Sequence, residues 1–318
     1  MSPSFPSAST FEDFGRVCRD EAALSPGVAA LCSRLGLDGV EPQRFKEGTL
    51  PVYAIGASNV LKLYAPVYFE EMPRESALLG LLEGRLPIPT PRVLAVGELD
   101  GWGYVLMTRL EGEMLASAWP RIERANRERL ASELGEALAG LHALRDERML
   151  AARVDWPAFI EEQRRTASER QRPRGLAEHW LEQIPALLAS TREPIDGADS
   201  ASLLHTEIMR EHLLVAPTSD GWRFSGLVDF EPSVVGAPEY EFAAVGLFFS
   251  AGDSSLLRRV LRAYGYADSA LDESLELRLC AYALLHKYSN LSWYLERMPP
   301  PKHVTRLEEL ASLWWGAR

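Results

Sequence analysis

The sequence predicts an α+β fold in two parts, a small β-sheet with one helix in residues 1–110 and a larger, mainly helical part in residues 111–318. β-branched and aromatic runs broken by turn residues precede Leu110, whereas leucines at helical spacing dominate after Gly112. The length of 318 residues suits about two domains of ordinary size. A composition with 47% hydrophobic and 25% charged residues is that of a globular protein with a substantial core.

Residues 1–110 are predicted to form a short N-terminal helical segment followed by a β-sheet. Two short helical patterns lie between residues 10 and 36. A leucine stripe predicts a helix over 71–83, and the prolines at 87–91 predict an extended stretch after it. Runs of strand-forming residues bounded by turn residues predict four strands, at 49–55, 60–64, 93–97 and 103–107. The first two of these strands are predicted to form a hairpin.

The second part carries the helical periodicity. One helix is indicated by a leucine stripe spaced four, four and three residues apart, namely Leu130, Leu134, Leu138 and Leu141. Further helices are predicted at 155–189, 254–266, 272–296 and 304–315. Short β-like runs at 203–204, 213–215 and 224–228 interrupt them and predict a small hairpin within the helical part.

Charge and composition narrow the classes of partner. The formal net charge of -11 repels phosphate backbones, so nucleic acid is an unfavourable partner. Most of the acidic excess lies after residue 110, where it suits a cationic substrate or simply keeps the protein dispersed. Apolar runs are too short to cross a bilayer, and the N-terminus lacks the pattern of a secretory signal, so we expect no membrane association and a cytoplasmic location. Three cysteines without paired spacing predict buried thiols rather than a disulfide or zinc site.

The most informative segment is a polar loop between two apolar runs. It reads His205-Thr206-Glu207-Ile208-Met209-Arg210-Glu211-His212, and a later apolar run ends at Asp229-Phe230-Glu231. Polar residues that fall just outside paired strands gather at one end of a hairpin. The sequence therefore predicts that Glu207, His212 and Asp229 share a site.

These segments resemble the aminoglycoside phosphotransferases and the related choline, homoserine and fructosamine kinases, which have a two-lobed protein-kinase-like fold. In that family the loop reads HGDxxxxN, and the later strand ends in DFG-like or DWE-like text followed by GDPxxD. Here the matching text is His205-Thr206-Glu207, His212, Asp229-Phe230-Glu231 and Gly236-Ala237-Pro238-Glu239-Tyr240-Glu241. The resemblance extends from about Phe45 to Phe249.

The resemblance implies an ATP site that uses Mg²⁺, with Mn²⁺ as an alternative, in the cleft between the lobes. Lys62 corresponds to the strand lysine that reaches the nucleotide phosphates, and Glu75 to its partner. Independently of the family, a carboxylate on the leucine stripe of a helix is costly unless a cation pairs with it. Asp229 corresponds to the main metal ligand. The resemblance also implies that Thr49 lies in the turn that covers the phosphates. It places Met107, Thr108 and Arg109 in the hinge, the segment that joins the two lobes and binds adenine.

The sequence departs from the family at its two most consequential positions. Glu207 stands at the catalytic aspartate, where it keeps a charge and a proton acceptor on a longer arm. His212 replaces the metal-binding asparagine, and an imidazole suits Mn²⁺ better than Mg²⁺, or it contacts a phosphate or the substrate instead. Glu241 also replaces an aspartate. Arg210 offers a cation near the expected γ-phosphate, or it pairs with Glu211 or Glu207.

Two main functions are compatible with these residues. The preferred one is a kinase that moves the γ-phosphate of ATP to a hydroxyl of a small molecule. An amine-bearing acceptor such as an aminoglycoside or choline is favoured, with a hydroxylated peptide or another biosynthetic intermediate as the alternative. The alternative is a nucleotide-binding pseudokinase with a regulatory or docking role, and a weaker one is nucleotidyl transfer. The acceptor pocket is expected among helices at 155–190 and 270–300, where Trp156, Trp180, Trp293 and Tyr294 either line it or belong to the core.

Overall fold

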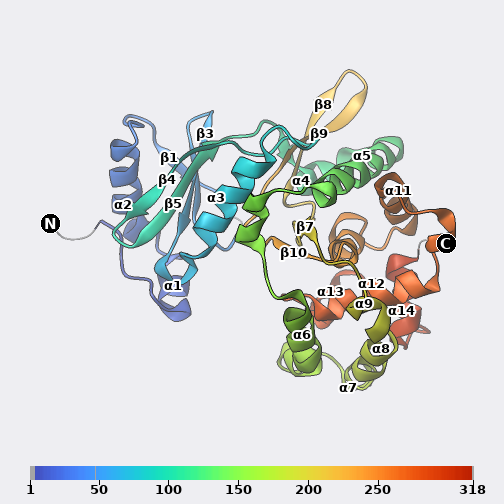
Figure 1. Ribbon diagram of the computed structural model, residues 1–318. Helices are drawn as coiled ribbons and strands as arrows, with labels where there is room; N and C mark the ends of the chain where they lie inside the picture. The colour runs from blue at the N-terminus through green and yellow to red at the C-terminus, as the bar shows by residue number, and fades with distance from the viewer. Residues whose placement is uncertain (1–3, 47, 317–318) are drawn as a thin grey trace. The chain divides into compact units, whose positions relative to one another are not determined.

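A computed structural model describes residues 4–46 and 48–316, and the chain divides into two compact units (Figure 1). Unit 1 contains the described residues of 1–85, 89–111 and 226–231. Unit 2 contains 86–88, 112–225 and the described residues of 232–318. The assignment of separate functions to residues 1–110 and 111–318 remains a prediction.

Unit 1 is a five-stranded antiparallel sheet with helices packed on it. The strand order is β1-β2-β3-β5-β4, with β1 (Pro42–Arg44), β2 (Val52–Ile55), β3 (Asn59–Tyr64), β4 (Val93–Leu99) and β5 (Trp102–Thr108). The predicted hairpin is β2–β3, which turns at Gly56, a residue with a φ of 64°. All four predicted strands are present, and the short edge strand β1 adds a fifth.

The helices of unit 1 are α1 (Phe11–Val17), α2 (Glu21–Arg34) and α3 (Glu71–Leu82), with a 3-10 turn η1 (Pro66–Tyr68). Side-chain caps start the first two helices, since Thr10 accepts from the amide of Asp13 and Asp20 from that of Ala23. α3 packs against β4 and β5 (Figure 1), and the leucines of its stripe are buried. This face also carries Glu75, so packing of α3 buries a carboxylate against the sheet.

Unit 2 is mainly helical. Its elements in order are β6 (Glu113–Met114), α4 (Leu115–Ala118), η2 (Trp119–Arg121), α5 (Arg124–Ala143), η3 (Glu147–Ala152), α6 (Trp156–Gln171), η4 (Arg172–Arg174), α7 (Glu178–Leu181), α8 (Ile184–Ser190), α9 (Arg192–Asp196), β7 (Ser202–Leu204), β8 (Leu213–Thr218), β9 (Gly221–Leu227), β10 (Val234–Gly236), α10 (Glu239–Ala244), the π-helical turn η5 (Val245–Phe249), α11 (Ser254–Tyr264), η6 (Asp268–Ala270), α12 (Glu273–Leu285), α13 (Leu291–Arg297) and α14 (Leu307–Trp315). The last two residues of β9 belong to unit 1.

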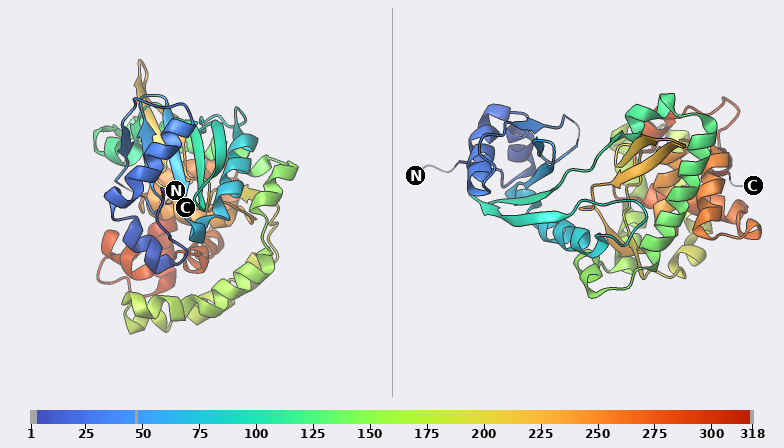
Figure 2. Two further views of the ribbon diagram at one scale, coloured as in Figure 1. Left: turned by 90° about the vertical axis from the view of Figure 1, so that its left-hand side faces the viewer. Right: turned by 90° about the horizontal axis from the view of Figure 1, so that it is seen from above.

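Two predicted long helices are interrupted. The helix predicted at 155–189 is three helices, α6, α7 and α8, because Pro173 lacks an amide donor and Gly175 turns left-handed with a φ of 77°. Figure 2 shows α6 and the helices after it following one another along one edge of unit 2. The helix predicted at 272–296 is α12 and α13, since the side chain of Asn290 caps a new helix by accepting from the amide of Trp293.

The strands of unit 2 form two small sheets. β7 pairs antiparallel with β10, while β8 lies between β6 and β9. The prediction that the run at 203–204 belongs to the same small hairpin as 213–215 was therefore wrong, because β7 finds its partner in residues 234–236 instead. The hairpin β8–β9 lies beside α5, where Arg129 donates to the carbonyls of Asp220 and Trp222 (Figure 1).

The three cysteines, all in the described part of the chain, are free. Cys32 and Cys280 are buried as predicted, whereas Cys18 is only partly buried. Burial raises the pKa of the Cys280 thiol to about 12, so this group stays protonated and behaves as a small apolar side chain. None of the helices in the described part of the chain has both the length and the apolar character needed to cross a bilayer.

Close packing of α5 against α11 depends on Gly135. A Cβ atom at this position would lie 2.3 Å from the carbonyl oxygen of Val260 and 2.8 Å from the Cβ of Ala263. We expect Gly135→Ala to lower the free energy of unfolding by about 2 kcal/mol, although alanine favours a helix. Denaturant unfolding measures this change.

Gly140 provides the matched control in the same helix. Its added Cβ would lie 3.8 Å from the nearest atom, so Gly140→Ala should leave stability unchanged or raise it by up to about 1 kcal/mol. Equal effects of the two substitutions would contradict the close approach at Gly135.

Candidate active site

A buried lysine and three carboxylates form the most unusual polar group of unit 1. Lys62, on β3, is only 4% exposed, and its Nζ lies 2.6 Å from Asp229, 2.7 Å from Glu231 and 3.0 Å from Glu75. We call Glu75, Asp229 and Glu231 the carboxylate cluster. One oxygen from each of these residues lies within 4.8 Å of the others. The predicted association of Lys62 with Glu75 and Asp229 is thus present in the geometry of unit 1.

Glu75 connects helix, sheet and the segment after β9. Its carboxylate accepts hydrogen bonds from Lys62, from the hydroxyl of Tyr64 and from the amide of Phe230, the last at 3.1 Å. Lys62 and Tyr64 are two residues apart on β3 and therefore project from the same face. The cost of burying Glu75 is offset by these donors, which also fix the position of residues 229–231.

Burial and neighbouring charges have opposite effects on the pKa values of this group. Burial alone would lower the pKa of Lys62, but Asp229, Glu231 and Glu75 overcome it and hold that pKa well above its usual value. Burial raises the pKa of Glu231 against the opposing effect of Lys62, and the nearby carboxylates Asp229 and Glu75 add to the rise. Lys62 is therefore a permanent cation whose charge holds crowded carboxylates together.

Asp229 adopts a backbone conformation that most residues avoid. Its φ is 77°, in the left-handed region, where aspartate is tolerated better than most non-glycine residues. Thr206, in the loop of unit 2, has a φ of 73° and is β-branched, which makes this conformation more costly. Strained residues of this kind often mark functional segments. The family text has glycine at the position of Thr206.

The structure places the remaining nucleotide-contact candidates on two segments of unit 1. Thr49 is exposed in the turn between β1 and β2, next to Gly48, whose φ is 100°. Met107 is buried in β5. The amides of Thr108 and Arg109 donate to the carbonyls of Arg92 and Ser58, so these two donors are already used within the unit. The roles of all four residues remain predictions.

In unit 2, the loop between β7 and β8 carries Glu207 and His212. Nδ1 of His212 lies 2.9 Å from the backbone carbonyl oxygen of Glu207. Because a carbonyl only accepts, this contact places the proton on Nδ1 and leaves Nε2 as the nitrogen with a lone pair. The amide of Glu207 in turn donates to Nδ1 of His205 at 3.3 Å. The loop is thus held by contacts between its own imidazoles and backbone.

A second buried carboxylate, Glu241 on α10, holds the start of this loop. Its Oε2 accepts from the amide of His205 at 2.6 Å, and Nε2 of His142 lies 3.6 Å from the same oxygen. His142 contacts the hydroxyl of Tyr264 through its other nitrogen at 3.0 Å. Glutamate therefore reaches the loop backbone from α10, at a position where the family text has aspartate.

Arg210 has partners that neither sequence-based alternative included. Its Nε donates to the carbonyl of Phe249 at 2.8 Å, and its guanidinium lies 3.7 Å from the ring centroid of Trp119. Burial lowers the pKa of Arg210 to about 10. This placement makes it a packing residue of unit 2. A role at the γ-phosphate remains a prediction, and it would require the side chain to leave Trp119.

Glu207 lies at a cavity of about 280 Å³ within unit 2. The other lining residues come from the same loop, from η5 and from the segment 286–294, and they are Met209, Phe248, His286, Tyr288, Asn290, Trp293 and Tyr294. Of the four aromatic residues singled out in the sequence, Trp293 and Tyr294 line this cavity, whereas Trp156 and Trp180 are buried side chains elsewhere in unit 2.

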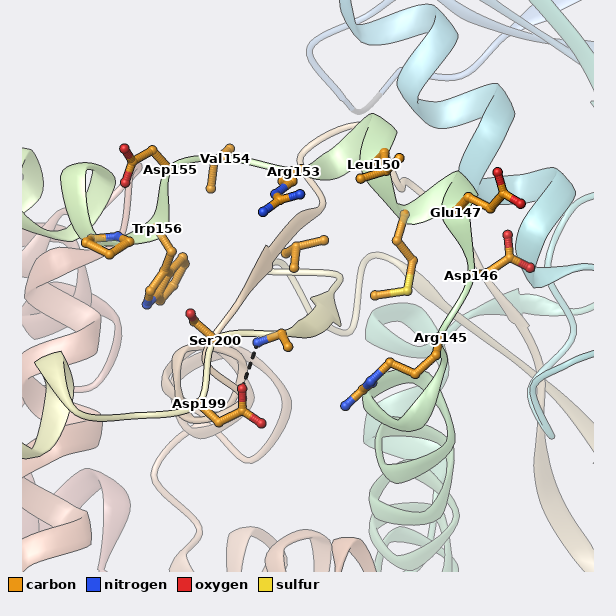
Figure 3. Close-up of a pocket in the computed structure, with 14 residues that line it drawn as sticks. Arg145, Asp146, Glu147, Leu150, Arg153, Val154, Asp155, Trp156, Asp199 and Ser200 are labelled. Carbon is orange, nitrogen blue, oxygen red and sulfur yellow. Dashed lines mark hydrogen bonds between the residues drawn. The ribbon is translucent and has the colours of Figure 1, made fainter.

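A larger cavity of about 880 Å³ lies between η3, the start of α6 and the segment before β7 (Figure 3). Several of its polar side chains already form hydrogen bonds with backbone groups. Asp155 accepts from the amide of Ala158, Asp199 from that of Ala201, and Arg145 donates to the carbonyls of His142 and Leu144. Trp156, one of the aromatic candidates for the acceptor pocket, lines it, whereas none of the predicted catalytic, nucleotide-contact or metal-ligand residues does. We therefore assign the candidate active site to the carboxylate cluster with Lys62 and to the cavity at Glu207.

Sequence reasoning missed several residues of this site, among them Tyr64, Glu231 and His286. Tyr64 lies two positions from Lys62 on β3, so strand alternation could have indicated it. Glu231 lies after the end of β9, where strand alternation does not apply. His286 had no such signal. It is buried, its Nε2 lies 3.2 Å from the carbonyl oxygen of Thr206, and its Nδ1 accepts from the amide of Tyr288.

Comparison with known proteins agrees with these features. Residues 41–277 match the phosphotransferase enzyme family. The match spans well over half of the chain, so the chain belongs to this family and is a kinase-like enzyme, as the sequence motifs predicted. A 205-residue stretch is also 23% identical to lysine-specific demethylase JMJ21 of Arabidopsis thaliana, covering 52% of this chain and 21% of that protein. The chain thus spans about one fifth of the length of that curated relative.

Solved structures share the fold. The GDP complex of wild-type aminoglycoside 2′-phosphotransferase-IIIa has a TM-score of 0.71 at 18% identity, covering 86% of this chain and 96% of that one. A streptomycin–ATP ternary complex of APH(2″)-IIa has a TM-score of 0.60 at 16% identity, covering 88% and 97%. Macrolide 2′-phosphotransferase MphH from Brachybacterium faecium has a TM-score of 0.56 at 20% identity, covering 87% and 99%. The predicted protein-kinase-like fold, a small sheet part and a helical part, is confirmed.

Replacement of Lys62 tests whether its charge holds the carboxylate cluster together. Lys62→Met keeps a long side chain but leaves three carboxylates without their shared cation, and we expect the free energy of unfolding at pH 7 to fall by about 3 kcal/mol. Urea unfolding measures the loss. Lys46→Met removes an exposed lysine of the same unit and should change stability by less than about 0.5 kcal/mol. Wild-type stability of the Lys62 variant would contradict this role.

His286 should make stability depend on pH. Burial lowers its pKa to about 4 in the folded protein, below the usual value of 6.5, so the folded state favours the neutral ring. The stability that the protein gains by holding this ring neutral is fully present above pH 6.5 and is lost as the pH falls toward 4. Between pH 7 and 4.5 wild type should lose roughly 2 to 3 kcal/mol more than His286→Gln in urea unfolding.

His179, which is exposed in the same unit, supplies the control for this measurement. His179→Gln should show the same loss of stability with falling pH as wild type. A His286→Gln profile that also matches wild type would show that the ring at 286 is not held neutral.

Proposed function

We propose that the protein transfers the γ-phosphate of ATP to a hydroxyl group of a small molecule. Membership of the phosphotransferase enzyme family supports this proposal. The observation that carries it is the position of Lys62, which is buried between the helix carboxylate Glu75 and the post-strand carboxylate Asp229. Structurally similar proteins are recorded in complexes with GDP and with ATP, which supports a nucleoside triphosphate as the donor.

In this proposal unit 1 binds the nucleotide. Lys62 binds the phosphates, Glu75 and Tyr64 orient its ammonium group, and the turn with Thr49 covers the phosphates. Residues Met107, Thr108 and Arg109 lie beside the base. Because the amides of Thr108 and Arg109 already donate within the unit, backbone donors to the base have to come from residues beyond Arg109.

The carboxylate cluster fits a hard divalent cation, since its three residues present oxygen ligands within 4.8 Å of one another. A bound Mg²⁺ would neutralise charge on the nucleotide phosphates. Asp229 is the proposed main ligand, and Glu231 offers a second oxygen from the same segment. His212, whose Nε2 carries the lone pair, is a proposed additional ligand that favours Mn²⁺.

Unit 2 is proposed to hold the acceptor in the cavity at Glu207. The acceptor oxygen forms a bond to the γ-phosphorus, the bond from that phosphorus to the bridging oxygen breaks, and ADP leaves. The hydroxyl proton passes to the carboxylate of Glu207, which also orients the attacking oxygen. Glu241 acts at a distance by holding the amide of His205, at the start of the same loop.

The chemistry of the acceptor is indicated by two observations that disagree. An amine-bearing acceptor is supported by the net negative charge of the chain and by the streptomycin complex of a structurally similar protein. The cavity at Glu207, however, has one carboxylate and is otherwise lined by neutral residues, four of them aromatic. Local charges act more strongly on a bound ligand than distant surface charges, which salt screens.

Nucleotide binding and phosphoryl transfer can be tested separately. Thermal shifts with ATP or GTP, with and without Mg²⁺ or Mn²⁺, report binding, and ADP release reports slow hydrolysis without a known acceptor. We expect Asp229→Asn to lose the metal-dependent part of the shift. Glu207→Gln should keep the full shift while lowering turnover by about 10²- to 10⁴-fold.

Glu211→Gln is the control for Glu207→Gln, because Glu211 is an exposed glutamate of the same loop. It should retain wild-type turnover. A metal-dependent thermal shift with neither hydrolysis nor transfer to a panel of alcohols would identify a pseudokinase and overturn the proposed reaction.

A further inference from the structure

The cavity at Glu207 is a preformed aromatic pocket. Its volume of about 280 Å³ accommodates a six-membered ring with substituents. Phe248 lies 6.1 Å from Trp293 and 5.7 Å from Tyr294, and the rings of Trp293 and Tyr294 are 5.8 Å apart between centroids. Offset and edge-on contacts of this kind give rigid apolar walls.

Two of the aromatic walls are unusually exposed for their size. Tyr288 is 47% exposed and Trp293 is 39% exposed, although most large apolar side chains of unit 2 are buried. Exposed aromatic side chains that line a cavity offer apolar area that a bound ligand can cover. The segment 286–290 that supplies this wall is braced by Arg170, which donates to the carbonyls of Leu284, His286 and Lys287.

The charges next to these walls are positive. Nζ of Lys287 lies 5.0 Å from the ring centroid of Tyr288, and Cζ of Arg297 lies 4.8 Å from that of Trp293. Neither cation has a carboxylate within ion-pair distance among the described residues. A third cation, Arg174, is near enough to affect the pKa of Tyr294. Glu207 is the one carboxylate among the lining residues of the cavity.

These surroundings disfavour a polyamine. Lys287 and Arg297 already lie over the rings of Tyr288 and Trp293, and they repel a further cation nearby. An anionic group at the mouth of the cavity, in contrast, would gain unpaired cations as partners. His286 adds no charge of its own, because its pKa of about 4 keeps the ring neutral near pH 7.

We propose that the acceptor is a hydroxylated molecule with an apolar ring, which enters the cavity, and a carboxylate or other anionic group, which binds Lys287 and Arg297. This proposal rests on the proposed function for the placement of the acceptor hydroxyl at Glu207. It replaces the amine-bearing acceptor as the preferred substrate class of this site.

Three small probes that differ in one substituent test the charge preference. Tropate, 2-phenylglycinol and 2-phenylpropan-1-ol share a phenyl ring and a primary alcohol, and they carry a carboxylate, an ammonium group and a methyl group respectively. Ligand-observed NMR titrations without nucleotide give their dissociation constants. We expect tropate to bind about tenfold more tightly than 2-phenylglycinol, with 2-phenylpropan-1-ol between them and the difference shrinking as salt is added.

Charge reversal at the mouth of the cavity provides the second measurement. The double variant K287E/R297E should reverse the order of tropate and 2-phenylglycinol while 2-phenylpropan-1-ol binds as before. Arg223→Glu reverses an exposed cation on β9 of the same unit and should preserve the wild-type order. Trp293→Ala should weaken all three probes, because it removes the shared apolar wall.

Each outcome bears on the proposal. Tighter binding of 2-phenylglycinol or kanamycin than of tropate, equal binding of all probes, or no binding of any probe at 10 mM would overturn it. The expected order together with absent phosphoryl transfer would support the pocket chemistry and reject the proposed reaction, because these titrations require neither nucleotide nor turnover.

Discussion

The burial of one lysine among three carboxylates is the constraint on which unit 1 depends. A lysine taken out of water is unstable unless anions surround it, and Glu75, Asp229 and Glu231 come from a helix and from a segment 154 to 156 residues further along the chain than Glu75. The strand, the helix and the distant segment are therefore held together at a single ammonium group. In the proposed function the same ammonium group binds the nucleotide phosphates.

In unit 2, buried and partly buried side chains similarly hold the backbone of the loop between β7 and β8. Glu241 accepts from the amide of His205, His286 contacts the carbonyl of Thr206, and His212 contacts the carbonyl of Glu207. Three consecutive residues of the loop are thus fixed through their backbone groups by buried or partly buried side chains. This explains how Thr206 retains a left-handed conformation that a β-branched residue avoids.

Several parts of this arrangement could be predicted because they depend on local pattern. The β2–β3 hairpin, α3 and the leucine stripe of α5 follow from periodicity and turn residues, and the need to pair a carboxylate on a leucine stripe indicated a cation for Glu75. Other features have no local signal. The pairing of β7 with β10 joins residues 30 to 34 positions apart, and the separation of α12 from α13 creates the segment that carries His286 and Tyr288.

The sequence by itself determined the family, the order of the elements and the residue types that phosphoryl transfer needs. These features depend on motifs and on spacing along the chain, which can be observed without the tertiary structure. Only the tertiary structure decided which charges surround each group. Arg210 packs on Trp119, and an acidic protein presents cations beside the aromatic pocket. Net charge is a sum over the whole chain, whereas a ligand responds to the few side chains within several ångströms of it.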